Sequence, residues 1–301
     1  MDEMEFIWHQ GEFVPWHQAK VHILTHSLHY GGAVFEGIRV YETDKGPAIF
    51  RLDEHIDRLF YSARQLAMSS SLSNQKVKDI IIELVDRNRM KKGYIRPLMY
   101  YGYNVMGLNP LKNPVEFSVA CWPWGAYLPF EAIDITISPF RRIHPKTTVP
   151  DAKICGNYVN SQLASLALRG TKYHEALLLD TEGFVAEGPG ENIFIVKDNQ
   201  LLTPKLGNIL PGITRDTLMI LAKEQGYAIK ECQLTVDDLL QADEAFFTGT
   251  AAEVTAIRSI DDTLIGDGTK GPVTSQLDDL YKKLVHGNYP SLDHYLTYVR
   301  Q

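Results

Sequence analysis

Apolar and polar residues alternate along the first part of the chain in a way that predicts short strands. The segment FIWHQGEFVP, residues 6–15, predicts a hairpin that turns at Gln10-Gly11. Two further strands are predicted at residues 34–42 and 47–52, because a turn-forming Thr-Asp-Lys-Gly sequence separates two runs of strand-forming residues. The chain is therefore expected to open with short strands joined by tight turns.

The apolar spacing then changes to that of helices. In residues 53–68 apolar side chains recur every three or four positions, and Asp53 is expected as the N-cap. Residues 74–90 repeat this spacing. Strands are predicted again at residues 94–103 and 116–124, so this part of the chain mixes both kinds of element.

Two prolines and a glycine in the segment CWPWGAYLPFEA, residues 121–132, indicate a linker between two domains. Beyond it, short predicted strands are interspersed with three predicted helices at 158–170, 213–226 and 272–287. Helices and strands do not alternate regularly, which favours an α+β fold over a doubly wound sheet. We expect a smaller N-terminal domain at 1–122, a linker at 123–135 and a larger C-terminal domain at 136–301.

Composition and charge exclude several classes of partner. The 301 residues are 45% hydrophobic and 22% charged, as in globular proteins, and the net charge of −7 argues against nucleic-acid binding. The only basic cluster is Arg141, Arg142 and Lys146. No stretch is long and apolar enough to cross a membrane, and three cysteines without a CxxC pair favour reduced thiols and a cytoplasmic location.

A lysine in the segment DAKICGNY, residues 151–158, is the first candidate for chemistry. Lys153 could form a Schiff base if a pocket lowered its pKa, but its spacing alone favours the ordinary interpretation of a surface lysine. The segment EGPGEN, residues 187–192, is the second, since Glu187 could pair with a cofactor ring and two glycines would allow close approach. A solvated turn explains that segment equally well.

Phosphate binding is a third possibility. A glycine precedes a threonine in LPGITRD, residues 210–216, and in FTGTAAE, residues 247–253. Each of these two segments is also common in ordinary turns. Arg58 is either a phosphate partner or a helix-surface arginine. His22, His26 and His29 have metal-like spacing but no matching carboxylate motif, so we expect no metal site.

Taken together, nine segments resemble, in order, the branched-chain-amino-acid aminotransferases, which are class IV enzymes dependent on pyridoxal phosphate. The segments are HSLHYGGAVFEGIR, EHIDRL, YIRP, MGLNP, PWGAYL, KICGNY, EGPGEN, LPGITRD and GTAAE. The resemblance covers nearly the whole chain. It implies a two-domain fold type IV architecture, similar to D-amino acid aminotransferase, with pyridoxal 5'-phosphate at the domain interface.

The resemblance also implies roles for individual residues. Lys153 would be the catalytic lysine, which forms the Schiff base with the cofactor and moves the proton between the substrate and the cofactor. Glu187 would keep the ring nitrogen protonated, and Tyr158 would bind the phenolic oxygen. The phosphate would be held by Arg58, Ile213, Thr214 and Thr250.

Substrate residues follow from the same resemblance. One pocket must admit leucine in one half-reaction and glutamate in the other. An apolar wall is implied at Phe35, Trp124, Tyr127 and Tyr158, with Tyr30 and Leu108 reaching in from a second subunit. The α-carboxylate would meet Tyr94, Thr250 and Ala251, and Arg96 would meet the side-chain carboxylate of glutamate.

The implied reaction transfers the amino group between L-leucine, L-isoleucine or L-valine and 2-oxoglutarate, so the partners are amino acids and 2-oxo acids. Pocket residues from two chains imply an obligate homodimer, which could assemble further into hexamers. Cys155 and Pro189 depart from the family pattern, where small residues are common. A D-amino acid or (R)-amine transaminase, a lyase of the aminodeoxychorismate type and a non-catalytic binding protein are the alternatives.

Overall fold

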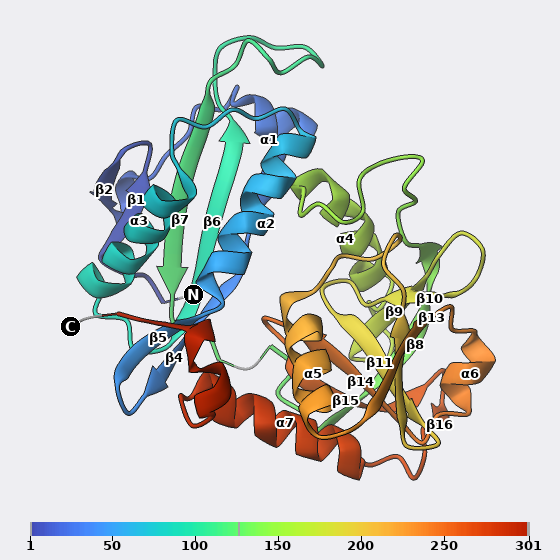
Figure 1. Ribbon diagram of the computed structural model, residues 1–301. Helices are drawn as coiled ribbons and strands as arrows, with labels where there is room; N and C mark the ends of the chain where they lie inside the picture. The colour runs from blue at the N-terminus through green and yellow to red at the C-terminus, as the bar shows by residue number, and fades with distance from the viewer. Residues whose placement is uncertain (1, 126, 300–301) are drawn as a thin grey trace. The chain divides into compact units, whose positions relative to one another are not determined.

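The computed structural model describes residues 2–125 and 127–299, which group into two compact units (Figure 1). Unit 1 comprises the chain up to Gly125, the segment Ala152–Gly156 and the chain from Leu284 onward. Unit 2 comprises the chain from residue 126 to Asp151 and the segment Asn157–Lys283. Each unit has its own sheet and its own covering helices.

Within the described residues, unit 1 is built on an eight-stranded sheet in the order β17-β5-β4-β6-β7-β1-β2, with β3 beside β6. Its neighbouring strands are antiparallel. The strands are β1 (Phe6–His9), β2 (Glu12–Pro15), β3 (Ala33–Phe35), β4 (Ile38–Thr43), β5 (Gly46–Phe50), β6 (Gly93–Tyr101), β7 (Val115–Trp122) and β17 (Leu296–Tyr298).

The two hairpins predicted in the first fifty residues are confirmed. In the first, His9 pairs with Glu12, and Gln10 and Gly11 both have the positive φ angles, 49° and 109°, that a tight two-residue turn requires. In the second, Thr43 pairs with Gly46. The strand predicted at 34–42 is interrupted at residues 36–37, where the chain passes from β3 to β4.

The α-helices that lie wholly in the described part of unit 1 are α1 (His26–Tyr30), α2 (Leu52–Gln65) and α3 (Asn74–Arg87), and short 3-10 helices lie at Trp16–Gln18 and Pro290–Tyr295. The predicted N-cap of α2 at Asp53 is wrong, because the helix begins one residue earlier and Arg51, with a φ of 50°, is its N-cap. Asp53 lies instead in the first turn, where a negative charge favours the helix dipole.

Helices α2 and α3 cover one face of this sheet (Figure 1). The Tyr101 hydroxyl of β6 donates to the Leu66 carbonyl at the end of α2, over 2.7 Å. The Asn88 amide, at the end of α3, lies 3.3 Å from Cys121 Sγ of β7. Because side chains alternate along a strand, Arg96 and Leu98 of β6 belong to the opposite face.

Within the described residues, unit 2 has a nine-stranded sheet in the order β10-β9-β8-β15-β14-β11-β12-β13, with β16 beside β15. Strand β10 also pairs with β11, so six of the strands close into a ring. The strands are β8 (Ala132–Arg141), β9 (Glu175–Leu179), β10 (Val185–Glu187), β11 (Asn192–Lys197), β12 (Gln200–Pro204), β13 (Ala228–Cys232), β14 (Glu244–Gly249), β15 (Glu253–Ile260) and β16 (Thr263–Leu264).

The helices in this part of the chain are α4 (Tyr158–Leu166), α5 (Ile213–Glu224), α6 (Val236–Leu240) and α7 (Pro272–Val285). Helix α4 packs on β8 and β9, and α5 packs on β13 and β14. The interior is apolar, with Ile135, Leu177, Ile193 and Phe247 fully buried. Mixed parallel and antiparallel pairing confirms the expected α+β class.

The expected domain bounds, 1–122 and 136–301 with a linker at 123–135, stay a prediction. Strand β8 begins at Ala132, and β17 pairs with β5, 246 residues earlier in the chain for the Leu296–Phe50 pair. Such long-range pairing leaves no local pattern in the sequence, which is why residues 284–301 were not expected beside the N-terminal strands. The structure contains no helix, over the residues it describes, with the length and apolarity needed to span a membrane.

Candidate active site

Helix α2 presents three polar side chains at helical spacing, His55, Arg58 and Ser62, and two of them meet a buried carboxylate. That carboxylate belongs to Glu36, which follows β3 and is 0% exposed. Arg58 Nε and Nη2 donate to its two oxygens over 2.6 and 2.9 Å, and His55 Nδ1 lies 2.7 Å from Oε2. Glu36 is therefore fixed by charge-assisted hydrogen bonds from two neighbours.

These contacts determine how the group is charged. Burial by itself would raise the pKa of Glu36, but the charge and hydrogen bonds of Arg58, together with His55, lower it far below its usual value. Burial lowers the pKa of His55, although the charge of Glu36 opposes this. Glu36 is thus an anion at neutral pH, and His55 is a neutral ring that donates from Nδ1.

Lys153 is held beside this group by its backbone. Its N–H donates to Ser62 Oγ over 2.9 Å, and its carbonyl accepts from the Phe35 N–H over 3.2 Å. The next residue, Ile154, forms a β-bridge with Val34. The Lys153 ammonium nitrogen lies 4.9 Å from the centre of the Phe35 ring, so the side chain is directed along β3.

The surroundings make Lys153 a reactive amine. Burial of its amine and then the positive charge of Arg58 lower its pKa to about 8 from the usual 10.5, while Glu36 acts in the opposite direction. A lysine with such a pKa is neutral in a sizeable fraction of molecules near neutral pH. It can therefore attack a carbonyl and exchange a proton, as a surface lysine cannot.

An aromatic wall surrounds Arg96 on the open face of β6. Its guanidinium carbon lies 4.9 Å from the Phe35 ring, 5.5 Å from Tyr94 and 5.7 Å from Trp122. Trp124 meets the Tyr94 ring edge-on, with 4.5 Å between ring centres. Nε of Arg96 is buried without a hydrogen-bond partner among the described residues, which is typical of a group that awaits an anionic ligand.

Arg96 and Cys155 also line a cavity of about 420 Å³, whose other walls include Leu98 and Leu28. Burial raises the pKa of the Cys155 thiol to about 11, although Arg96 and Lys153 act against this. Cys155 is therefore protonated and apolar in character at neutral pH. The departure from the family pattern at this position adds a small apolar wall and no charge.

Tyr30 and Leu108, expected to serve a second subunit, are exposed in the single chain by 43% and 84%. Leu108 stands next to Gly107, whose carbonyl accepts a hydrogen bond of 2.7 Å from Nε2 of the buried His26. The Asn113 side chain further accepts from the Val105 N–H over 2.8 Å. The loop is thus hydrogen-bonded internally and holds an apolar side chain in solvent.

In unit 2 the carboxylate of Glu187 is buried at the end of β10 and receives three donors. Arg142 forms an ion pair with it through Nε. Asn192 Nδ2 donates to Oε2 over 3.0 Å, and the Leu210 N–H donates over 3.1 Å. The sequence had indicated no more than a small basic cluster at Arg142, so its pairing with a residue 45 positions away was missed.

Helix α5 begins three residues after Leu210, whose N–H donates to this carboxylate. Its N-cap is Gly212, which provides no side-chain cap, and Thr214 in the first turn is 3% exposed. A Cβ at Gly212 would stand 1.9 Å from Asn192 Oδ1, so only glycine lets the backbone pass the residue that holds Glu187. A long helix with an uncapped N-terminus favours anions.

Tyr127 and Ala251 are brought together by unit 2, where both line a cavity of about 420 Å³. The Tyr127 hydroxyl donates to Glu175 over 3.3 Å. Thr250 is half-buried and directly follows β14, and Tyr158 is half-buried at the first position of α4. The expected site residues thus form two sets, one in each unit.

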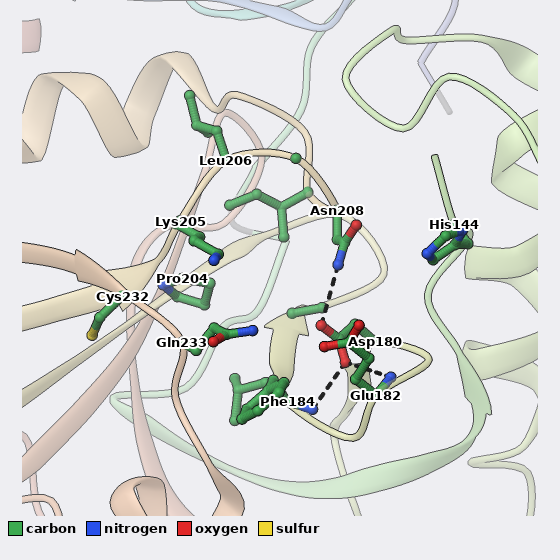
Figure 2. Close-up of a pocket in the computed structure, with 14 residues that line it drawn as sticks. His144, Asp180, Glu182, Phe184, Pro204, Lys205, Leu206, Asn208, Cys232 and Gln233 are labelled. Atoms are coloured by element: carbon green, nitrogen blue, oxygen red, sulfur yellow. Dashed lines mark hydrogen bonds between the residues drawn. The ribbon is translucent and has the colours of Figure 1, made fainter. Parts of the chain in front are cut away.

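A further cavity of about 280 Å³ lies beneath the loop between β12 and α5, and none of the expected site residues lines it (Figure 2). Asp180 accepts from Asn208 Nδ2 over 3.1 Å and from the N–H groups of Glu182 and Phe184, both over 2.9 Å (Figure 2). These bonds tie down the loop that places the Leu210 N–H against Glu187. The cavity supports the site rather than forming part of it.

The three histidines with metal-like spacing make separate contacts. The His22 ring stacks on Tyr103, while Nε2 of His26 and of His29 each meet a backbone carbonyl. Over residues 2–125 and 127–299 there is no group of three or more His, Cys, Asp or Glu placed to hold a metal ion.

Comparison with known proteins identifies the family. Residues 33–260 match the model of the amino-transferase class IV family. A branched-chain-amino-acid aminotransferase of Pseudomonas aeruginosa is 45% identical over 98% of this chain and 97% of its own length. The crystal structure of the T.th. branched-chain amino acid aminotransferase with N-(5'-phosphopyridoxyl)-L-glutamate is 46% identical, with a TM-score of 0.97 over 100% of both chains.

The same T.th. enzyme with pyridoxamine 5'-phosphate is similar to this chain at 45% identity, with a TM-score of 0.97 over 100% of both chains. The matched region covers the whole chain, and with it the segments that carry Lys153 and Glu187. The chain therefore belongs to the branched-chain-amino-acid aminotransferases of the class IV aminotransferase family.

Proposed function

We propose that this protein transfers the amino group between L-leucine, L-isoleucine or L-valine and 2-oxoglutarate, with pyridoxal 5'-phosphate as its cofactor. The observation that carries the proposal is Lys153, an amine with a pKa lowered to about 8 beside an arginine. Two structures of one related enzyme, with N-(5'-phosphopyridoxyl)-L-glutamate and with pyridoxamine 5'-phosphate, support the cofactor.

The side chains present fit this cofactor. An aldehyde needs a neutral amine, and Lys153 has the lowered pKa for that. A pyridine nitrogen needs a fixed anion, and Glu187 is held by Arg142, Asn192 and the Leu210 N–H. A phosphate is favoured at a helix N-terminus, and Gly212, the N-cap of α5, provides no side-chain cap there.

The residue roles in unit 1 follow from chemistry and resemblance together. When bound, the cofactor supplies an electron sink for the bond to the substrate α-hydrogen. Lys153 Nζ would take the proton from the substrate α-carbon and deliver it to the cofactor, which a pKa of about 8 allows near neutral pH. Arg58 binds the phosphate as a fixed cation.

The residues in unit 2 bind the other parts of the same cofactor. Glu187 holds the proton of the ring nitrogen, and Tyr158 donates to the phenolic oxygen. The phosphate oxygens accept from the backbone of Ile213 and from the hydroxyls of Thr214 and Thr250. Both sets of residues would then serve one site, and the cofactor would lie between the two domains.

The substrate pocket must bind an apolar side chain in one half-reaction and a carboxylate in the other, and the surroundings of Arg96 provide for both. Its Nε is buried without a partner among the described residues, and its other neighbours include the Phe35, Tyr94 and Trp122 rings. A glutamate side chain would meet the guanidinium, while a leucine side chain would meet the aromatic rings and Trp124. The α-carboxylate would be bound by Tyr94 and by the backbone at Thr250 and Ala251, beside Tyr127.

We further propose an obligate homodimer, in which Tyr30 and Leu108 complete the pocket of the partner. Their exposure of 43% and 84% in the single chain is consistent with this, because it leaves both side chains accessible to a second subunit. Sedimentation would give the mass, which distinguishes dimers from hexamers. We also propose a cytoplasmic location, because the three cysteines are separate free thiols. The domain bounds of 1–122 and 136–301 are proposed from the composition of the linker at residues 123–135.

The experiment that tests the proposal compares the purified protein with its Lys153→Ala variant. The wild type should show the visible band of a lysine-bound cofactor and should form L-glutamate from L-leucine and 2-oxoglutarate. The variant should lose both, with turnover at least about a thousandfold lower, while its circular dichroism stays unchanged. Full activity in the variant would contradict the proposal. Pyruvate release without a 2-oxo acid acceptor would identify a lyase.

A further inference from the structure

Glu36 is a buried anion that none of the expected roles uses. Its side chain is 0% exposed, and its oxygens accept from Arg58 Nε and Nη2, from His55 Nδ1 and, at 3.3 Å, from the Gly37 N–H. Taking a carboxylate out of water is costly unless it is fully paired. A complete set of partners around a residue beside the proposed site indicates more than a packing role.

The contact with Arg58 fixes the direction of its guanidinium. Nε and Nη2 lie along one edge of that planar group, and both donate to Glu36 over 2.6 and 2.9 Å. The Nη1 corner consequently points away from Glu36. Arginine binds phosphate through such fixed planar donors, so the orientation imposed by Glu36 decides where a phosphate oxygen can be received.

Glu36 also acts on Lys153, which is tied to the same helix. Ser62 Oγ accepts from the Lys153 N–H over 2.9 Å and donates to the Arg58 carbonyl over 2.8 Å. The charged and titratable groups of unit 1 that interact with the Lys153 amine are Arg58 and His55 on α2, Glu36 after β3, Tyr94 and Arg96 on β6, and Cys155 two residues further along the chain. Among these, Glu36 is the anion that balances two arginines.

We infer that Glu36 is the positioning residue of this half of the site: it orients Arg58 toward the cofactor phosphate and offsets the positive charge around the Lys153 amine. This inference rests on the proposed function, because it assumes the phosphate of pyridoxal phosphate as the ligand of Arg58. Glu36 itself touches neither substrate nor cofactor. It acts on the cofactor phosphate through Arg58, and it acts on the reacting amine through the charge that it places near Lys153.

The first test compares cofactor binding by the cofactor-free full-length chain and its Glu36→Gln variant. Pyridoxal 5'-phosphate should bind the variant about tenfold more weakly, since Arg58 loses one of its two ionic hydrogen bonds. Pyridoxal, which lacks the phosphate, should not bind the variant more weakly than the wild type, because the lost contact concerns the phosphate and a lower pKa of Lys153 favours the imine. Equal weakening of both ligands, or unchanged binding of both, would overturn the positioning role.

The second test needs no cofactor and measures the charge effect directly. Acetylation of Lys153 by a water-soluble acetyl ester is followed from pH 6 to pH 10 by peptide mass spectrometry. Glu36 raises the pKa of Lys153, so in Glu36→Gln the midpoint should move to lower pH. Glu36→Asp keeps the negative charge on a shorter side chain. The pH midpoint of Lys153 acetylation should therefore equal that of the wild type, while pyridoxal phosphate should still bind more weakly than to the wild type.

Glu54→Gln is the matched control. Glu54 lies on α2, as Arg58 does, but it pairs with Arg51 over 2.8 Å. It should change neither measurement. An unchanged midpoint in Glu36→Gln would overturn the charge role. If the glutamine variant does not fold, Glu36→Asp still tests the orientation of Arg58, because it should bind pyridoxal 5'-phosphate more weakly while its acetylation midpoint stays that of the wild type. Failure of the wild type to bind pyridoxal phosphate would contradict the proposed function instead. The acetylation result would still measure the charge effect of Glu36 on Lys153, because that test needs no cofactor.

Discussion

Lys153 shows how a few neighbours change the chemistry of one residue. Its ordinary pKa of 10.5 would leave about one amine in a thousand neutral at pH 7.5, whereas a pKa of about 8 leaves roughly a quarter neutral. Both causes, burial and the charge of Arg58, favour the neutral form. The neutral amine is the reactive form, so the lowered pKa moves reactivity into the physiological range.

The rate at which the cofactor-free chain takes up pyridoxal phosphate should follow this pKa. Below pH 8 Lys153 is mostly protonated and the rate should be low; it should rise to a plateau with a midpoint near pH 8. Stopped-flow absorbance of the visible band, recorded from pH 6 to pH 11, measures the profile. A midpoint near 10.5 would show that the environment of Lys153 does not perturb it.

Glu187 is the residue whose charge the proposed reaction needs most. In Glu187→Gln the side chain keeps its shape and can still accept from Leu210, but the anion beside the ring nitrogen is lost. Turnover should fall about a hundredfold or more, while pyridoxal phosphate still binds. Glu182→Gln, an exposed neighbour along the chain, is the control and should retain full turnover. Equal rates for both variants would exclude this role for Glu187.

Among the elements, α2 in unit 1 and α5 in unit 2 each carry a set of the proposed site residues. Helix α2 holds Arg58, His55 and Ser62 on one face, and α5 offers an uncapped N-terminus. The sequence predicted both helices from apolar spacing. It did not predict their partners, because Glu36 and Arg58 are 22 positions apart and Arg142 and Glu187 are 45 positions apart. A charged residue inside the apolar strand pattern VFEGIR was the one available signal for Glu36.

Helix α7 illustrates the same limit, since its N-terminus is capped from another element. The Glu244 carboxylate of β14 accepts from the Val273 N–H over 2.9 Å, and from the Thr274 N–H and hydroxyl over 2.7 and 2.6 Å. No local sequence pattern announces a cap that comes from 29 residues away.

Removing that cap should destabilise the protein without touching the chemistry. Glu244→Ala leaves buried donors at the start of α7 without an acceptor, so the free energy of unfolding should fall by about 2 kcal/mol. Urea unfolding measures the change, with the exposed Asp279→Ala on the same helix as control. A loss no larger than that of the control would show that the contact contributes little.

At the scale of the whole molecule, the sequence allowed the α+β class, the family and both site-bearing segments to be predicted. The order of the strands could not be, because β17 joins the first sheet through β5 and β10 closes a ring by pairing with both β9 and β11. Those pairings depend on contacts between distant residues, which hydrophobic periodicity does not encode. Departures such as Cys155 were visible in the sequence, but their surroundings were not.

The measurement that tests the central claim most directly is the visible spectrum of the purified protein before and after L-leucine, with D-alanine in a parallel cuvette. We expect L-leucine alone to convert the band of the lysine-bound cofactor to that of the pyridoxamine form. Conversion by D-alanine alone would keep the cofactor assignment and contradict the substrate. Absence of any visible band after addition of pyridoxal phosphate would contradict the role of Lys153, and the account with it.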